Sequence, residues 1–392
     1  MPCYTTLWTY PWDLHDAGAE AAVRSMKDEI GLDGVSLAAA YHTFEMLRPR
    51  SQDRLLLQAQ QAAVYFRPQL DLYDDTRIKP HVSPLMGDAN WYAEAAEAAG
   101  KVGIDLVAWT VFLHNSYQAG LHPECAQVSC TGDISTAVLC PANPDVRAFA
   151  AALARDMGAN YGIALLECES LAYGGFGHIH YHSKYGVELG PTDRFALSLC
   201  FCSACREAAR ASGLDPDGIG RDLETRVRHA LLAGGSIPGT PEQLVGDVPG
   251  LGDYVQMRED TVASLLREVR DAAGVPVSFI FMGDRLTSGG DRKRMADVAD
   301  FVETLSYTSD PLRTEQTISG LLPDVPSADR LLVGLQAYPP ASPDADTLKA
   351  NVVSAMGLGI RRFSFYNFGI MPPANLDWVR EAVEAARGPT PA

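Results

Sequence analysis

Short apolar runs alternate with longer amphipathic stretches along most of the chain. Eight runs have the length of a buried strand, and the stretches between them carry apolar residues at helical spacing. This alternation predicts a parallel sheet built from strand–helix units. The expected strands are residues 4–10, 34–41, 104–113, 163–170, 275–282, 301–308, 331–338 and 362–368, and the expected helices include 19–30, 91–99, 145–157, 254–273 and 376–387.

Eight such units with right-handed connections close into a (β/α)8 barrel, or TIM barrel. The alternative is a doubly wound open sheet, which favours a glycine-rich phosphate loop after the first strand, where Trp12 and Asp13 stand instead. Length alone does not divide the chain, because barrels with inserted loops often exceed about 250 residues. We expect one domain over residues 1–387, followed by a disordered tail at 388–392.

Two segments are longer than a barrel needs. Residues 114–139 follow the third expected strand, and residues 171–252 form an insertion after the fourth. Within that insertion, the Gly and Pro residues of 233–252 indicate an irregular surface excursion. Loops at the C-terminal ends of barrel strands carry function, so we expect the working site at that mouth.

The fourth strand carries two glutamates, Glu167 and Glu169. Strand alternation puts them on one face together with Leu165. Helices seal the outer face of a barrel, so the carboxylates are expected to face the lumen, with Glu169 nearer the mouth. Burial and mutual repulsion raise a carboxyl pKa, as a general acid requires, although Glu167 also suits a structural partner of a buried polar group.

Aromatic, amide and imidazole side chains follow six strand ends. Aromatic faces interleaved with hydrogen-bonding groups suit a sugar ring, which has apolar C–H faces and a rim of hydroxyls. The sequence therefore predicts a small-molecule carbohydrate substrate. The residues expected to bind it are Trp12, Asp13, Tyr41, His42, His114, Asn115, Tyr307, Gln336, Tyr338, Tyr366 and Asn367.

Two further clusters contain potential metal ligands. His178, His180 and His182 alternate in the insertion, where they could contact substrate, make ordinary hydrogen bonds or ligate a transition metal. Three thiols at 200, 202 and 205 are close enough in sequence to chelate one zinc if a fourth ligand joins them. The alternative for these thiols is free buried cysteines.

The net charge and the N-terminal sequence limit which partners and which compartment we expect. The formal net charge is −17 and no basic stripe is present, so we expect neither nucleic acid nor an anionic membrane as a partner. A neutral or cationic substrate fits this charge. No apolar stretch has the length of a membrane span, and the N-terminus has no signal-peptide pattern, so we expect a cytoplasmic protein. We expect no organic cofactor, and the oligomeric state stays open.

The order of features over residues 140–210 resembles the central part of the family 42 β-galactosidases. Cys140-Pro141-Ala142-Asn143-Pro144 is followed by a helix, by a strand ending in Glu, and by a Cys-x-Cys-x-x-Cys motif. The resemblance implies a glycosyl-hydrolase-like barrel. It also implies Cys140, Cys200, Cys202 and Cys205 as ligands of a structural zinc, and Glu169, or else Glu167, as the acid/base.

The chain departs from that family in two places. The fourth strand lacks the Asn-Glu pair of the family. The seventh ends Gly334-Leu335-Gln336-Ala337-Tyr338, with no carboxylate where the family has its nucleophilic Glu. The retaining mechanism therefore does not transfer unchanged. The candidates for a second carboxylate are Asp13, Asp284, Glu303 and Asp310.

Three functions remain in competition. The leading hypothesis is a glycoside hydrolase with Glu169 as general acid and Glu167, Asp284 or Glu303 as its catalytic partner. The second is a metal- or base-dependent sugar isomerase or lyase. The third is a catalytically silent sugar-binding barrel, which Gln336 makes credible.

Overall fold

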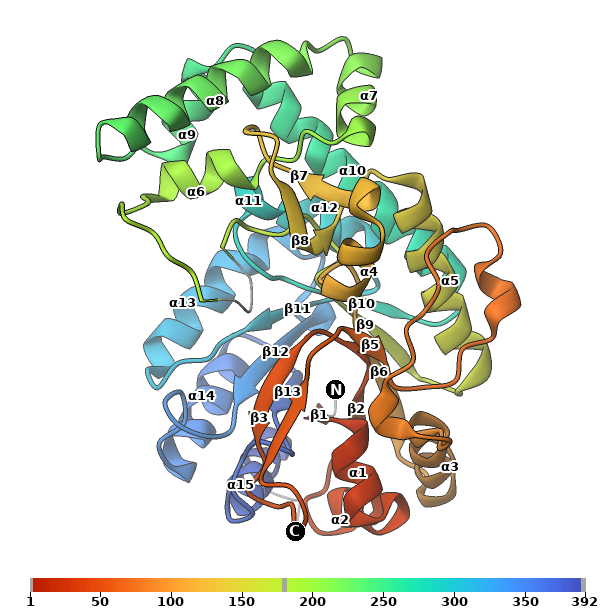
Figure 1. Ribbon diagram of the computed structural model, residues 1–392. Helices are drawn as coiled ribbons and strands as arrows, with labels where there is room; N and C mark the ends of the chain where they lie inside the picture. The colour runs from red at the N-terminus through yellow and green to blue at the C-terminus, as the bar shows by residue number, and fades with distance from the viewer. Residues whose placement is uncertain (1–2, 178–181, 389–392) are drawn as a thin grey trace.

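A closed barrel of eight parallel strands forms the centre of the molecule (Figure 1), as the computed structural model describes it for residues 3–177 and 182–388. The order β1-β13-β12-β11-β10-β9-β6-β2 closes through the pairing of β1 with β2. The predicted (β/α)8 class is therefore confirmed. The barrel strands are β1 (Tyr4–Thr9), β2 (Gly34–Tyr41), β6 (Asp105–Val111), β9 (Leu165–Glu169), β10 (Val277–Ile280), β11 (Phe301–Leu305), β12 (Leu331–Gln336) and β13 (Arg362–Tyr366).

Helices surround this barrel and bury the outward faces of its strands. Gly158 lets two of them, α5 and α10, approach closely, because a Cβ at this glycine would lie 1.8 Å from the carbonyl oxygen of Ala273. The surrounding helices are α1 (Pro11–Ala17), α2 (Ala19–Asp28), α3 (Trp91–Val102), α5 (Pro144–Asn160), α10 (Leu251–Ala273), α12 (Arg292–Val298), α13 (Pro311–Leu321), α14 (Ala345–Gly357) and α15 (Asn375–Arg387).

Three segments at the C-terminal ends of the strands extend beyond the barrel. The sequence flagged two of them and missed the third, residues 42–90, which forms the hairpin β3 (Phe44–Leu47) and β4 (Leu56–Ala59) and the short strand β5 (Ala63–Val64). The segment after β6 contains α4 (Ser116–Leu121), β7 (Ala126–Val128) and β8 (Ile134–Leu139). The insertion after β9 contains α6 (Pro191–Ser198), α7 (Ser203–Ala211), α8 (Pro216–Leu232) and α9 (Pro241–Asp247).

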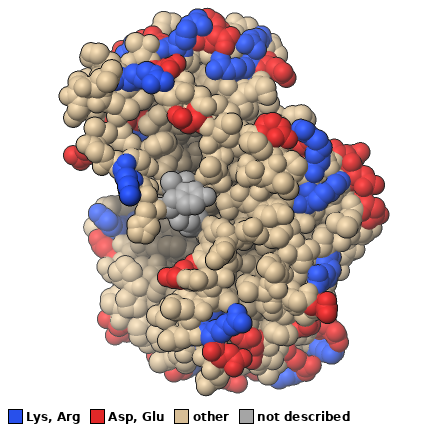
Figure 2. Space-filling view, in the orientation of Figure 1, with Lys and Arg blue, Asp and Glu red and all other residues tan. Residues whose placement is uncertain are grey.

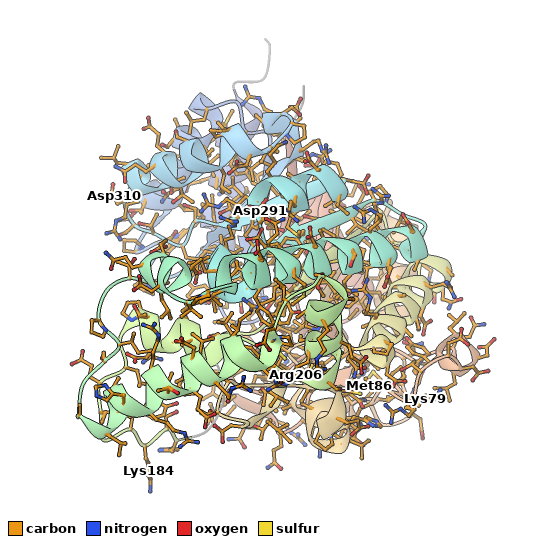
Figure 3. All side chains as sticks on the ribbon, turned by 90° about the horizontal axis from the view of Figure 1, so that it is seen from above. Lys79, Met86, Lys184, Arg206, Asp291 and Asp310 are labelled. Atoms are coloured by element: carbon orange, nitrogen blue, oxygen red, sulfur yellow. The ribbon has the colours of Figure 1, made fainter. Side chains whose placement is uncertain are left out.

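The insertion packs against α10 through a second hydrophobic cluster, to which Phe195 and Leu223 of the insertion and Tyr254 of α10 contribute. Its helices lie beside the long helix α10, as the view from above shows (Figure 3). The irregular excursion expected at 233–252 is wrong in part, because Thr240 and Gln243 form a capping box that starts α9. The expected tail beyond Gly388 lies outside the described residues. Among the helices of the described residues, none combines the length and apolar character needed to cross a membrane.

Candidate active site

Strand register determines which side chains line the lumen. Glu167 pairs with Trp109 on one side and with Ser278 on the other, so all three point inward, and Glu303 shares that face through Ile280. The floor of the lumen is apolar and contains Val107, Leu165, Phe301 and Leu332. The carboxylates therefore lie in the upper, C-terminal part of the barrel, where barrel enzymes carry their sites.

Glu167 is completely buried and held by two donors. Its Oε2 accepts a hydrogen bond from the indole nitrogen of Trp8 at 3.0 Å and another from the hydroxyl of Ser36, while Oε1 has no partner. Burial raises the pKa of Glu167 to about 7, and the charge of Glu169 adds to the shift, whereas the two hydrogen bonds oppose it. This carboxyl is therefore poised between its neutral and ionised forms near neutral pH.

Glu169 is the last residue of β9 and the most accessible of the lumen carboxylates. It is 9% exposed, whereas Glu167 and Glu303 are at 0%. Its Oε2 accepts a hydrogen bond from the indole nitrogen of Trp109 at 2.6 Å, and burial raises its pKa to about 7. The next residue, Ser170, has a φ of 54°, which is rare for a residue with a side chain and is often found at functional sites.

Glu303 is the third buried carboxylate. It accepts a hydrogen bond from the hydroxyl of Ser364, and Gly334 leaves room for it, since a Cβ there would lie 3.3 Å from Glu303 Oε1. Burial raises the pKa of Glu303 well above its usual range, and the charges of Glu167 and Glu169 raise it further.

Among the described residues, no Lys or Arg side chain is a cause of the shifted pKa of any of the three carboxyls. An uncompensated buried charge is costly, so such groups hold protons instead. The carboxyls of the upper lumen are therefore expected to hold protons up to about neutral pH.

Aromatic rings surround the carboxyls. Trp8 and Trp109 stack with centroids 5.2 Å apart, and Tyr366 stands edge-on to Trp8 at 5.3 Å. The Tyr10 hydroxyl lies 3.1 Å from that of Tyr41 and 3.0 Å from that of Tyr366. Tyr307 and Tyr338 flank Tyr366, with centroids at 5.8 and 6.3 Å.

A hollow of about 230 Å³ opens beside Ser170, the residue that follows Glu169. His114 borders it and stacks on His42 with centroids 4.7 Å apart. The face in Figure 2 carries charged side chains at its upper end, along its right edge and at its lower end.

Several expected contact residues have other partners. Trp12 is buried and stacks between Tyr10 and Phe44. The buried Asp13 forms an ion pair with Arg48 at 2.9 Å, and burial raises the pKa of Asp13 to about 6.

Three amide side chains bond to the main chain of their own loops. Gln336 donates to the carbonyl oxygens of Tyr338 and Pro339, and Asn115 caps α4. Asn367 is buried and accepts from the amide of Gly369. These bonds orient the loops that follow β12, β6 and β13.

The candidate second carboxylates other than Glu303 do not join the lumen cluster. Asp284 is exposed and caps the short helix α11 (Arg285–Ser288) through the amide of Thr287. Asp310 is exposed, caps α13 and lies at the periphery of the molecule (Figure 3). His178 and His180 lie outside the described residues, and His182 is exposed.

Sequence reasoning missed the donors to the carboxyls. Trp109, Ser36 and Ser364 were not singled out, although each stands at an inward position of its strand. Alternation along β6 was the available signal for Trp109, but the pairing of its strand with β9 was needed to identify its acceptor.

Four buried cysteines converge outside the barrel. The sulfur atoms of Cys140, Cys200, Cys202 and Cys205 all lie within 4.8 Å of one another, and those of Cys140 and Cys205 are 3.4 Å apart. Zn–S bonds of about 2.3 Å in a tetrahedron put sulfur atoms just under 4 Å apart, so the set fits one metal ion. The amide of Val128 also donates to Cys200 Sγ at 3.4 Å, as expected around thiolate ligands. The cluster links the start of α5 to the insertion.

No family model matches the sequence, and no curated protein matches it either. Several solved structures are similar over nearly all of this chain, among them the following three. The β-amylase catalytic domain of Paenibacillus polymyxa has a TM-score of 0.60 at 12% identity, with 98% of this chain and 99% of that chain covered.

The other two structures belong to longer chains. The GH42 β-galactosidase Gan42B of G. stearothermophilus has a TM-score of 0.57 at 10% identity, with 98% and 56% covered. The α-L-fucosidase isoenzyme 2 of Paenibacillus thiaminolyticus has a TM-score of 0.56 at 12% identity, with 98% and 49% covered. This chain thus spans about half the length of the last two. The expected resemblance is confirmed at the level of the fold, which is a glycosyl-hydrolase-like (β/α)8 barrel.

Proposed function

We propose that this protein is a carbohydrate-active enzyme that hydrolyses a glycosidic bond, with Glu169 as general acid. One observation carries the proposal: Glu169 ends a barrel strand, retains 9% exposure among buried carboxyls, and has a pKa raised to about 7. A carboxyl with that pKa is partly protonated at neutral pH and can donate its proton. The similarity to three glycosidase folds supports the reaction class.

The chemistry follows from this arrangement. Glu169 protonates the bridging oxygen as the bond from that oxygen to the anomeric carbon breaks, and water then supplies a hydroxyl to the carbon and a proton to the carboxylate. Trp109 donates to the carboxylate that Glu169 becomes. A lumen carboxyl in its ionised form, such as Glu167, would stabilise the positive charge that develops on the sugar ring.

We assign Glu303 as the second carboxylate and Asp284 as the alternative. Glu303 faces the same lumen as Glu169, whereas Asp284 caps α11. Glu167 lies one layer below Glu169, and its charge raises the pKa of Glu303. The rings of Tyr41, Tyr307, Tyr338 and Tyr366, together with His42 and His114, would hold the sugar.

We also propose that the four converging cysteines hold one structural zinc. When bound, zinc would tie the insertion to the barrel through Cys140. The site is fully built from thiols and offers no open position to substrate, so its role is stability. Native mass spectrometry should detect one tightly held zinc per chain.

A silent sugar-binding barrel is the second candidate, because β12 carries Gln336 in place of a carboxylate and Glu167 is fixed by Trp8 and Ser36. A metal-dependent isomerase would need ligands in the lumen. The four thiols are the single metal-binding group found among the residues described. Two results would argue against the isomerase. Bound zinc would remain after replacement of His178, His180 and His182, and activity would be insensitive to mild chelation.

Glu169→Gln tests the proposal. The variant keeps the shape and removes the acid, so kcat should fall by roughly 10² to 10⁴ on substrates with poor leaving groups. Nitrophenyl glycosides need less protonation and should be affected less. Near wild-type rates on both classes would overturn the assignment, and saturable sugar binding without turnover across a glycoside panel would establish the silent barrel.

A further inference from the structure

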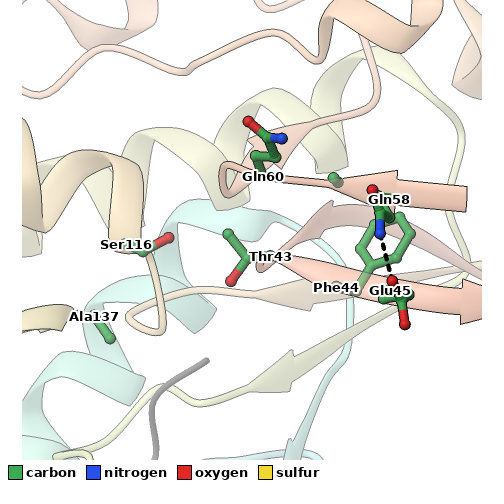
Figure 4. A pocket seen from close by; sticks show the side chains of 8 residues that line it. Thr43, Phe44, Glu45, Gln58, Gln60, Ser116 and Ala137 are labelled. Atoms are coloured by element: carbon green, nitrogen blue, oxygen red, sulfur yellow. Dashed lines mark hydrogen bonds between the residues drawn. The ribbon is translucent and has the colours of Figure 1, made fainter. Parts of the chain in front are cut away.

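A second hollow, larger than the one beside Ser170, lies between the β3–β4 hairpin and the start of α4. Its volume is about 470 Å³, within the range of about 300–1,000 Å³ that ligand sites occupy. In Figure 4 the side chain of Ser116 points across it toward Thr43, and Gln60 stands above them. The hollow belongs to no part of the lumen cluster described above.

The groups that line this hollow favour one ligand chemistry. Gln58 and Gln60 supply amides, Thr43 and Ser116 supply hydroxyls, and Phe44 supplies an aromatic ring. Glu45 adds a carboxylate, which accepts a hydrogen bond from the Gln58 amide. No Lys or Arg is among these described lining residues, so no cation is available to pair with an anionic ligand. Amides and hydroxyls beside an aromatic face suit a neutral, hydroxyl-rich ring.

The hollow is connected to the lumen through shared residues. Phe44 stacks on Trp12 at 4.9 Å and stands edge-on to Tyr41 at 5.8 Å, so one ring borders both the hollow and the aromatic lining of the barrel mouth. Thr43 follows His42 directly, and Ser116 lies two residues after His114. His42 and His114 stack on each other, and His114 lines the hollow beside Ser170.

We propose that this hollow is a remote sugar subsite, so that the protein acts on a neutral oligosaccharide or polysaccharide rather than on a simple glycoside. The inference rests on the proposed glycosidase activity. One unit of the glycan would lie beside Glu169, and another would bind between the hairpin and α4. Gln60 is a specificity-determining residue in this arrangement, because its amide is exposed and has no role in the lumen.

Substrate length provides the test. Wild type, Gln60→Ala and the double variant Gln58→Ala/Gln60→Ala are assayed on nitrophenyl monosaccharide glycosides and on oligosaccharides of two to six units. The oligosaccharides are β-1,4-glucans, β-1,4-galactans, β-1,4-xylans and α-1,4-glucans. For the sugar that is cleaved, kcat/KM should rise at least tenfold with length. In the double variant, KM on the longer substrates should rise roughly tenfold, as expected for the loss of one or two hydrogen bonds. Its rates on nitrophenyl glycosides should stay unchanged.

The matched control is Gln316→Ala, which replaces an exposed glutamine on α13 and should change neither quantity. Calorimetry with the Glu169→Gln variant measures binding of the same oligosaccharides without turnover, and Gln58→Ala/Gln60→Ala in that background should weaken it by the same factor. Turnover of nitrophenyl glycosides with no length dependence, or binding unchanged by the double variant, would overturn the subsite while leaving the glycosidase proposal intact. Absence of turnover on every substrate would overturn the glycosidase proposal itself.

Discussion

The molecule contains two buried clusters of acidic groups, and they differ in how their charge is balanced. Four thiols outside the barrel lie within 4.8 Å of one another, at the separations that a single metal ion imposes. The three lumen glutamates are each held by an indole or hydroxyl donor, and they form no such group. Convergent soft ligands favour a metal, whereas separately held carboxyls with a polar donor each favour protons.

The largest effect is expected at the thiol cluster. Cys140→Ser should abolish stoichiometric zinc and lower the free energy of unfolding by about 4 kcal/mol or more, since metal binding at a structural site contributes directly to folding. Native mass spectrometry and denaturant unfolding measure both. Cys130→Ser is the matched control, because Cys130 is buried in the hydrophobic cluster of the insertion, away from the four thiols. An equal loss of bound zinc and of unfolding free energy in the two variants would mean that the cluster binds no metal.

The next largest effect is expected in the pH dependence of the free energy of unfolding, through Glu167. Its pKa is raised in the fold to about 7, from a usual value of 4.5, so its contribution to stability is full below pH 4.5 and is lost as pH rises through about 7. Glu167→Gln removes this dependence. The stability of the variant relative to wild type should therefore rise by roughly 3 kcal/mol between pH 4 and pH 8. A constant difference across that range would show that Glu167 does not titrate as described.

Activity should depend on pH through Glu169. A general acid must be protonated, and burial raises the pKa of Glu169 to about 7, so kcat/KM should fall about tenfold per pH unit above that value. The Glu169→Gln variant should lose this alkaline limb when assayed on nitrophenyl glycosides. A profile that stays flat to pH 9 in wild type would exclude a carboxyl acid.

The smallest effect is expected at Trp109, which donates to Glu169 at 2.6 Å. Trp109→Phe keeps a ring against Trp8 but removes a hydrogen bond that favours the ionised carboxylate. The alkaline limb of the pH profile should therefore move up by roughly one unit, the equivalent of about 1.4 kcal/mol. Trp91→Phe is the control, because Trp91 lies on α3 and its indole nitrogen bonds to none of the glutamates.

Much of the barrel could be predicted from the sequence, because strand and helix periodicities differ and repeat eight times. Alternation in β9 predicted the shared face of Glu167 and Glu169. Motif spacing predicted three of the four cysteines, and the resemblance to the family 42 β-galactosidases added Cys140. The donors Trp8, Trp109 and Ser364 could not be assigned to their acceptors, since that depends on register between strands far apart in the sequence. The β3–β4 hairpin was missed because its strands are only four residues each, too short to show a clear alternation of apolar and polar positions.

Carbon-13 NMR of the glutamate carboxyls most directly tests whether the lumen glutamates stay protonated up to about neutral pH. Spectra of protein labelled at the glutamate side-chain carboxyl carbon, with Glu169→Gln and Glu167→Gln for assignment, are recorded from pH 5 to pH 9. We expect the Glu167 and Glu169 signals to shift with apparent pKa values near 7, far above those of exposed glutamates. Signals already at the position of ionised carboxylates at pH 5 would contradict the raised pKa values of these glutamates. They would also remove the basis for Glu169 as a general acid.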